Sequence, residues 1–355
     1  MRRLALLSLA LIAVGGIAAA ALWNRPPTPE MPPAAAGFGS TEETAALAAS
    51  NGMAWRSGAV LSLRLKSGEV LALTDRSTCG DLPCPKELAT RYRYLGWDAA
   101  HGGYRLLVAE PGMQQMILPY GEDDPVLVDA SHAAPAAGGA LPRPAPPPAV
   151  KTDASLGEWL ADIAGGRGQS EAPLIAASQG AVSRQGATLT ITLADGRQFS
   201  LTDDLACGQV SCPPQVFRSF DFAGHSPDGR FDVVQVRWDE ASAAFLVDRR
   251  NGAITSLLGV PKFSPAGKRA IASVTDLEWS APRRLEVWSL TGPAPGLEFS
   301  LSASEEDDTV YQVTGWDDAD HVRLRRGAWA STQRSDVMLV HDAEGWHIEG
   351  GDGTN

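Results

Sequence analysis

Residues 48–85 read AASNGMAWRSGAVLSLRLKSGEVLALTDRSTCGDLPCP, and they can be laid without a gap on residues 176–213, which read AASQGAVSRQGATLTITLADGRQFSLTDDLACGQVSCP. Each position of the second stretch lies 128 residues after its counterpart, so Cys79 matches Cys207 and Cys84 matches Cys212. Internal repeats decide the architecture before any local pattern does. We therefore expect a duplicated β-rich unit in which each copy carries one pair of cysteines.

Hydrophobic periodicity gives each copy the pattern of a β-hairpin. Leu61, Leu63 and Leu65 alternate with polar residues, residues 66–68 form a turn, and an apolar stretch returns from Val70. The second copy repeats this pattern from Leu189 and turns at Asp195-Gly196. The duplication extends further. Tyr92 and Tyr94 match Phe220 and Phe222 at the same offset, and residues 104–107 answer residues 231–234 if one residue is dropped.

Composition describes a folded acidic protein. The chain has 355 residues, of which 44% are hydrophobic, and ten tryptophans, enough for one or two ordinary cores. Its formal net charge is −12, and short arginine pairs such as Arg249/Arg250 and Arg325/Arg326 lie among acidic residues. Since nucleic-acid affinity rests on neutralising phosphates, DNA and RNA are excluded as partners.

The N-terminus has the pattern of an export signal. Met1-Arg2-Arg3 precedes an uncharged run from Leu4 to Trp23, and small residues suited to cleavage lie at positions 18–21. The run is also long enough to span a bilayer, so residues 1–23 are a signal peptide or a signal anchor. Either reading places the body in the cell envelope, periplasmic or otherwise extracytoplasmic. An uncleaved segment would hold it to the membrane, with the N-terminus in the cytoplasm.

A location outside the cytoplasm affects the predicted oxidation state of the four cysteines. In an oxidising compartment, an even number in matched pairs predicts disulfides. We favour Cys79–Cys84 and Cys207–Cys212, because each copy then contains its own bridge and needs no partner copy. Each small loop would contribute about 2 kcal/mol. A four-thiolate zinc site is the alternative, although no histidine lies beside either pair.

Changes in composition along the chain also indicate its segment boundaries. Residues 24–39 are a Pro/Ala-rich spacer, residues 40–132 the first copy of the β unit, and residues 133–152 an Ala/Pro linker. Residues 153–355 hold a helix, the second copy and a further β region. Two short helices are expected, because Ser40–Glu43 and Ser155–Glu158 both have the capping-box pattern; the second helix would run to Ile163.

The last third is rich in strands, with a strong hairpin signal at Asn251-Gly252. The string Phe263-Ser264-Pro265-Ala266-Gly267-Lys268-Arg269 and a later strand ending in Thr291-Gly292 resemble a blade of the TolB-like or WD40-like β-propellers. His225–Arg230 resembles the same turn, and Gly315–Asp318 is a degenerate third. The resemblance implies about three blade-like units, a rigid platform that binds other proteins, and no catalytic residue.

The predicted fold is therefore mainly β, with duplicated hairpin units and blade-like antiparallel sheets. A partial or irregular propeller and a β-sandwich both remain open. Two short helices complete the fold.

Residues with catalytic potential are scattered. No nucleophile elbow, zinc-protease helix, phosphate loop or dinucleotide fingerprint occurs, so we expect no catalytic residue, no cofactor and no metal. His341 and His347 could share a strand face and a metal, and the acidic runs 305–308 and 317–320 could hold calcium, although ordinary turns are the simpler interpretation. Thr74-Asp75 and Thr202-Asp203 are expected to cap the turns into the bridged loops.

These observations favour a non-enzymatic envelope protein that acts as a binding or assembly module with an envelope protein as partner. The alternative is an envelope hydrolase on an incomplete propeller-like fold, which predicts a deep polar pocket. Five tryptophans lie between residues 279 and 346, and any that are exposed together would suit a protein or glycan contact. These five tryptophans are Trp279, Trp288, Trp316, Trp329 and Trp346. The sequence does not predict the oligomeric state.

Overall fold

The architecture comes from a computed structural model of the whole chain. From Glu43 onward the chain forms one compact unit. The structure describes residues 40–86, 88–108, 114–120, 126–128, 170–212, 216–238, 241–273, 283–302, 309–328 and 333–350. The export segment, the linker 133–152 and the helix expected at Ser155–Ile163 lie outside these residues.

The first copy begins with helix α2 (Thr41–Ala49) and ends with a four-stranded sheet. A three-stranded antiparallel sheet and a two-stranded hairpin lie between them. The three-stranded sheet contains β1 (Ala54–Ser57), β2 (Val60–Arg64) and β3 (Val70–Thr74), and the hairpin contains β4 (Thr78–Cys79) and β5 (Leu82–Pro83). The four-stranded sheet contains β6 (Tyr92–Asp98), β7 (Gly103–Val108), β8 (Gln114–Pro119) and β9 (Val126–Val128).

The second copy repeats this order, starting with helical residues 170–177. Its three-stranded sheet contains β10 (Val182–Gln185), β11 (Thr188–Thr192) and β12 (Gln198–Thr202), and its hairpin contains β13 (Ala206–Cys207) and β14 (Val210–Ser211). Its four-stranded sheet contains β15 (Ser219–His225), β16 (Phe231–Trp238), β17 (Ala241–Asp248) and β18 (Ile254–Leu257).

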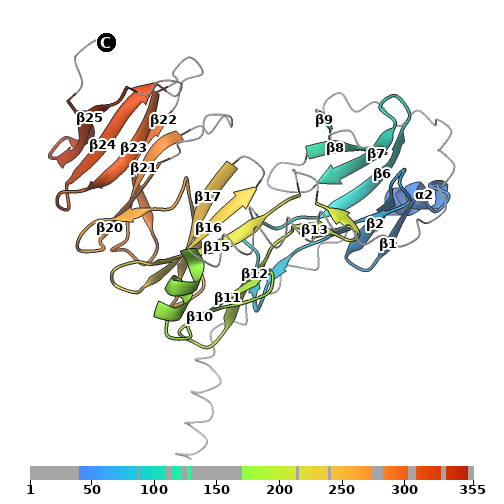
Figure 1. Cartoon of the computed structure of the whole chain (residues 1–355), viewed down its shortest axis with the longest axis horizontal. Helices are drawn as coiled ribbons and strands as arrows, with labels where there is room; N and C mark the ends of the chain where they lie inside the picture. Colours follow the sequence, from blue (N-terminus) through green and yellow to red (C-terminus); the bar gives the residue numbers. More distant parts are fainter. Residues whose placement is uncertain are drawn as a thin grey trace, which may run out of the picture. The chain divides into compact units, whose positions relative to one another are not determined.

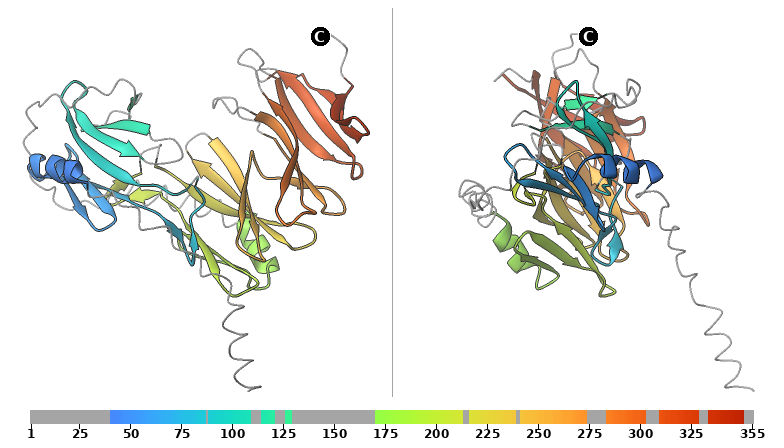
Figure 2. Two further views of the ribbon diagram at one scale, coloured as in Figure 1. Left: turned by 180° about the vertical axis from the view of Figure 1, so that it is seen from behind. Right: turned by 90° about the vertical axis from the view of Figure 1, so that its right-hand side faces the viewer.

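Two further four-stranded sheets follow. One contains β19 (Lys262–Phe263), β20 (Arg269–Ser273), β21 (Arg283–Ser289) and β22 (Gly296–Ser302). The other contains β23 (Thr309–Trp316), β24 (His321–Ala328), β25 (Ser335–Asp342) and β26 (Gly345–Glu349). The protein is thus mainly β. Its described residues hold three four-stranded sheets in the C-terminal part, where the blade resemblance implied about three, and a fourth such sheet in the first copy. Figures 1 and 2 show how these strands follow one another along the chain.

Strand alternation lets the β15–β18 sheet bury both of its faces. Val234 and Val236 point into a core shared with β10–β12, whereas Phe231 and Val233 point into a second core shared with β19–β22. The β19–β22 sheet packs its other face against β23–β26, for example through Ile271. This face-to-face packing of consecutive antiparallel sheets is blade-like, as predicted.

The hairpins that carry the cysteines are exchanged between the two copies. Cys79, Cys84 and Leu82 are buried in the core of the second copy, and Cys207 and Cys212 are buried in the core of the first. The Sγ atoms of Cys79 and Cys84 are 2.18 Å apart, and those of Cys207 and Cys212 are 2.12 Å apart. The pairing is therefore local, but the reason given for it was wrong, because each bridged hairpin packs against the partner copy.

The offset of 128 holds through the first two strands of each four-stranded sheet and becomes 129 from the third strand on. Tyr94 pairs with Leu106 in one copy and Phe222 pairs with Val234 in the other, and both sheets have a bulge next, at Gly96 and Gly224. The prediction that one residue must be dropped before residue 104 was therefore wrong. Tyr104 corresponds to Asp232, so an aromatic residue in one copy stands where the other has a carboxylate.

A buried ion pair joins the elements within each copy. Arg184 donates from Nε to Glu171 at 2.6 Å and binds the carbonyl of Phe220, and the backbone N–H of Phe222 donates to Glu171 at 2.6 Å. Arg56 and Glu43 make the equivalent contacts in the first copy. Glu43 and Glu171 are 1% and 3% exposed, so these contacts fix the helix on the sheets.

Candidate interaction site at the joint of the last two sheets

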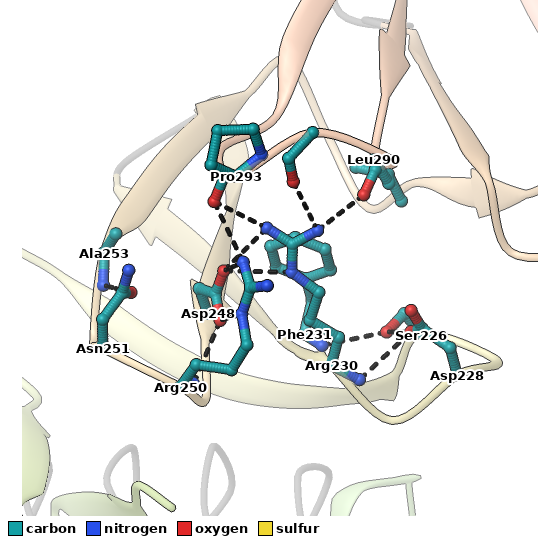
Figure 3. A network of polar contacts seen from close by, with 11 residues as sticks. Ser226, Asp228, Arg230, Phe231, Asp248, Arg250, Asn251, Ala253, Leu290 and Pro293 are labelled. Atoms are coloured by element: carbon teal, nitrogen blue, oxygen red, sulfur yellow. Dashed lines mark hydrogen bonds and ion pairs between the residues drawn. The ribbon is translucent and has the colours of Figure 1, made fainter.

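Each joint between the stacked C-terminal sheets contains an arginine at its edge. Arg230 lies between the β15–β18 and β19–β22 sheets and donates to the carbonyl oxygens of Leu290, Gly292 and Pro293 at 2.7 to 2.8 Å. Its Nη2 atom also donates to Asp248 at 2.9 Å (Figure 3). The side chains of Arg230 and Asp248 are only 12% and 2% exposed. This joint is closed and holds the two sheets together.

The turn before Arg230 has the structure that the blade resemblance implied. The Ser226 hydroxyl donates to Asp228 at 2.6 Å and accepts the backbone N–H of Phe231 at 2.9 Å. Ser264 accepts the N–H of Arg269 at 3.1 Å in the same way. In both turns the serine fixes where the next strand begins.

Arg269 lies between the β19–β22 and β23–β26 sheets, in a more open joint. Its Nε atom donates to Glu298 at 2.7 Å, and its Nη1 atom donates to Asp320 at 2.7 Å. The guanidinium carbon lies 5.2 Å from the centre of the Trp346 ring, and Trp346 donates to Glu298 at 3.2 Å. His341 completes this group, its ring 4.9 Å from that of Trp346 and its Nδ1 atom 3.2 Å from Asp320.

We call Arg269, Glu298, Asp320, His341 and Trp346 the Arg269 cluster. The side chains of Arg269, Glu298, His341 and Asp320 are 19%, 26%, 33% and 47% exposed. The cluster is therefore fixed in position and open to solvent. An aromatic ring, a guanidinium and carboxylates held in this way are suited to contact another molecule.

The acidic turn 317–320 borders the cluster. Asp318 accepts the backbone N–H of Asp320 at 2.8 Å and lies 2.9 Å from the His321 ring. These hydrogen bonds lower the pKa of Asp318, and the Asp318 hydrogen bond raises the pKa of His321. The hydrogen bond from Arg269 lowers the pKa of Asp320. At neutral pH this turn is anionic and faces solvent.

His341 and His347 do not share a face. His341 pairs with Trp346 across the β25–β26 hairpin, while His347 pairs with Val340, so the two imidazoles point to opposite sides of the sheet. The sequence interpretation failed because the turn at 343–344 interrupts the alternation. Each histidine in the described part of the chain has a carboxylate neighbour, and no group of three metal ligands occurs there.

The outer face of the β23–β26 sheet has a shallow depression of about 540 Å³ lined by residues such as Arg323, Arg325 and Met338. Arg323 pairs with Asp317 at 2.9 Å and Arg325 with Asp336 at 3.6 Å. Both arginines are 57% exposed. This depression is open to solvent and bordered by charged side chains.

Asp75 and Asp203 each accept a backbone N–H at the start of the four-stranded sheet, that of Tyr92 or Phe220, at 2.8 Å. They thus connect the three-stranded sheet to the next strand. For Asp75, this contact stands in place of the predicted cap of the bridged loop. Burial raises the pKa of Asp75 despite its contact with Arg56.

The remaining candidate residues lie in different parts of the chain. Trp316 lies against Trp346 with ring centres 6.2 Å apart, whereas Trp288 packs in the preceding joint. Trp279, Trp329, His132 and the acidic run 305–308 lie outside the described residues. The sequence reasoning missed Glu43 and Glu171, although the offset of 128 would have matched them. Glu298 had no sequence signal at all.

Within the described residues, no helix is long and apolar enough to cross a bilayer; the run from Leu4 to Trp23 is not among them. The two disulfides are typical of proteins outside the cytoplasm.

Comparisons with known proteins do not show a family for this chain. No family model and no curated protein matches the chain. Among solved structures, a crystal structure of TolB from Acinetobacter baumannii aligns over 75% of this chain and 66% of that one, just under two thirds of its length. The identity is 11% and the TM-score 0.18.

Proposed function

We propose that the protein is a binding module of the cell envelope that uses the Arg269 cluster and the acidic turn 317–320 to hold a partner protein. The observation that carries this proposal is the cluster itself, an aromatic ring and a guanidinium fixed by two carboxylates in a joint that solvent reaches. Rigid aromatic and arginine side chains are enriched where proteins bind one another, because they lose little freedom on binding.

The charge of the site indicates the kind of partner. Asp318 is 59% and Asp320 47% exposed, and both carboxyl groups have lowered pKa values. A basic surface would complement this turn and accelerate the encounter. The export pattern at residues 1–23 and the two disulfides support a location outside the cytoplasm, where the uncleaved segment would act as an anchor.

The test is site-specific photo-crosslinking of the full-length protein in native envelopes. A crosslinker at Glu344, in the exposed turn beside Trp346, should capture one protein in near-stoichiometric amount. A crosslinker at Ser67, in an exposed turn of the first copy, serves as the matched control. Asp318→Lys should abolish capture from position 344, because it replaces the most exposed carboxylate described in the turn with a cationic side chain.

Equal capture from both positions, or capture unchanged by D318K, would contradict the proposal. Turnover of a generic ester, phosphate or glycoside that a single Asp or His substitution abolishes would instead support a hydrolase.

A further inference from the structure

The contacts between the two copies of the duplicated unit are reciprocal. The Asp81 N–H donates to the carbonyl of Gln198 at 2.9 Å, and the Gln209 N–H donates to the carbonyl of Val70 at 3.1 Å. In return, the Gln198 N–H donates to the Asp81 carboxylate and the Val70 N–H to the Gln209 amide oxygen, both at 2.9 Å. Each contact maps onto the other by the same offset of 128.

Backbone pairing follows the same rule. Gly80 of the first hairpin pairs with Phe199 on β12, and Gly208 of the second hairpin pairs with Leu71 on β3. Together with the exchanged cores, this reciprocity makes the interface isologous, as in a two-fold symmetric dimer. The two copies are thus arranged as an internal dimer with exchanged hairpins.

One pair of side chains lies on the axis of this internal dimer. Arg76 donates to Asp204 at 2.6 Å, and these residues are exact counterparts, 128 positions apart. A residue that touches its own counterpart across a two-fold interface must lie on the axis. Two identical copies would place arginine against arginine or aspartate against aspartate at this point.

The neighbouring matched positions, 90 and 218, also differ between the copies. Asp204 pairs through its backbone with Arg218, and Arg76 pairs with Thr90, the counterpart of Arg218. The carboxylate of Asp204 therefore has two arginines near it, one from each copy. Its side chain is 30% exposed and that of Arg76 is 19% exposed, so solvent only partly screens the charges.

We propose that the hairpin-exchange surface of the first copy accepts the second copy and rejects another first copy, and that the Arg76–Asp204 pair on its axis determines this choice. The partner of the first copy is the second copy, because two first copies would oppose like charges at a partly buried point. This inference is independent of the Arg269 cluster and of the proposed function.

The experiment uses the full chain with a specific protease site placed between the copies, within residues 133–152, and cut after folding. The two halves should stay together through gel filtration and give a one-to-one complex in native mass spectrometry. Arg76→Asp places two carboxylates on the axis and should weaken the complex by about 100-fold. Ser67→Ala, in an exposed turn, is the matched control and should leave the affinity unchanged.

A mirrored variant makes the test specific. Exchanging the axis residues between the copies, as R76D with T90R, D204R and R218T, restores the same four side chains in mirrored positions and should recover affinity to within about tenfold of the parent. If R76D does not fold, Asp204→Asn, which removes one charge without opposing two, should weaken the complex by about tenfold.

Separation of the halves on cutting, or homodimers of the first half in the native spectra, would overturn the proposal. So would an unchanged affinity in R76D, or a folded mirrored variant as weak as R76D.

Discussion

At the scale of single residues, the interior ion pairs fix the positions of the elements in each copy. Glu171 is 3% exposed and accepts from Arg184 and from the N–H of Phe222. A buried charge that loses its partner costs far more than an exposed one, because neither water nor a counter-charge stabilises it. An ion pair of the same groups at the surface contributes little to the free energy of unfolding.

Glu171→Gln should therefore lower the free energy of unfolding by about 3 kcal/mol, since it removes the closer of the two buried carboxylates that pair with Arg184 and leaves only Asp203, at 3.5 Å. The measurement is urea denaturation followed by tryptophan fluorescence. Asp195→Asn, which breaks the Arg197 pair in an exposed turn of the same copy, is the control and should leave the urea midpoint unchanged. Equal shifts of the urea midpoint in the two variants would contradict the prediction that burial determines how much each ion pair contributes to stability.

The histidine of the acidic turn should titrate above its ordinary pKa of 6.5, because the Asp318 carboxylate stabilises the imidazolium. A raised folded pKa means that this contact stabilises the protein fully below the ordinary pKa and is lost as pH rises through the folded value. A histidine NMR titration should show a higher pKa for His321 than for the same residue in Asp318→Asn. Identical titration curves would contradict the assigned hydrogen bond.

At the scale of elements, the exchanged hairpins depend on two glycines that touch the opposite copy. A Cβ atom at Gly208 would lie 2.8 Å from the carbonyl oxygen of Val70, and one at Gly80 would lie 2.6 Å from that of Gln198. Both glycines have positive φ, which side chains disfavour. Substitution there combines backbone strain with a clash, and the two effects need separate controls.

Gly208→Ala should destabilise the protein by about 1 to 3 kcal/mol more than Gly196→Ala. Gly196 has a φ of +85°, close to the +77° of Gly208, but a Cβ atom there meets nothing within 4 Å. The control therefore carries the strain of positive φ without the clash. Thermal unfolding of both variants gives the comparison, and equal melting temperatures would mean that the hairpin does not press on β3.

Much of this element-level structure was predictable from the sequence, and the reason is periodicity. Leu61 and Leu63 alternate with polar residues, and Asn251-Gly252 has few alternatives to a hairpin turn. Serine and glycine at fixed positions also mark the blade turns before Phe231 and Arg269. Such signals are local in the chain.

The exchange of the hairpins was not predictable, because it depends on contacts 117 to 139 residues apart. The Arg269 cluster is likewise assembled from four strands and one turn, and its glutamate, Glu298, lies in a strand with no distinguishing sequence pattern. His341 and His347 show the same limit at short range, since a two-residue turn was enough to place them on opposite faces.

At the scale of the whole molecule, the last sheet differs from those before it. The β15–β18 and β19–β22 sheets bury apolar residues on both faces, whereas β23–β26 buries one face and exposes Arg323, Arg325 and Glu349 on the other. A polar outer face is what ends a stack of repeats, because it needs no further sheet to cover it. Within the described part of the chain, this outer face needs no further sheet to cover it.

The position of the disulfides links the stability of the two copies to each other. Each bridge is buried in the copy to which it does not belong, with the four cysteines between 2% and 9% exposed. A reductant attacks a sulfur atom directly and needs access to it. We expect both bridges to become reducible in one event, the separation of the two copies.

The test is a time course of dithiothreitol treatment under native conditions, with alkylation and intact mass at each point. The chain should pass from no alkylated cysteine to four, with little of the species that carries two, and subdenaturing urea should accelerate both steps equally, because it promotes separation of the copies. Gly208→Ala should accelerate them as well, whereas Gly196→Ala, which leaves the exchange surface intact, should accelerate them less. Persistent accumulation of a folded species with one bridge reduced would show that the hairpins open independently, and the copies would then not form one cooperative unit.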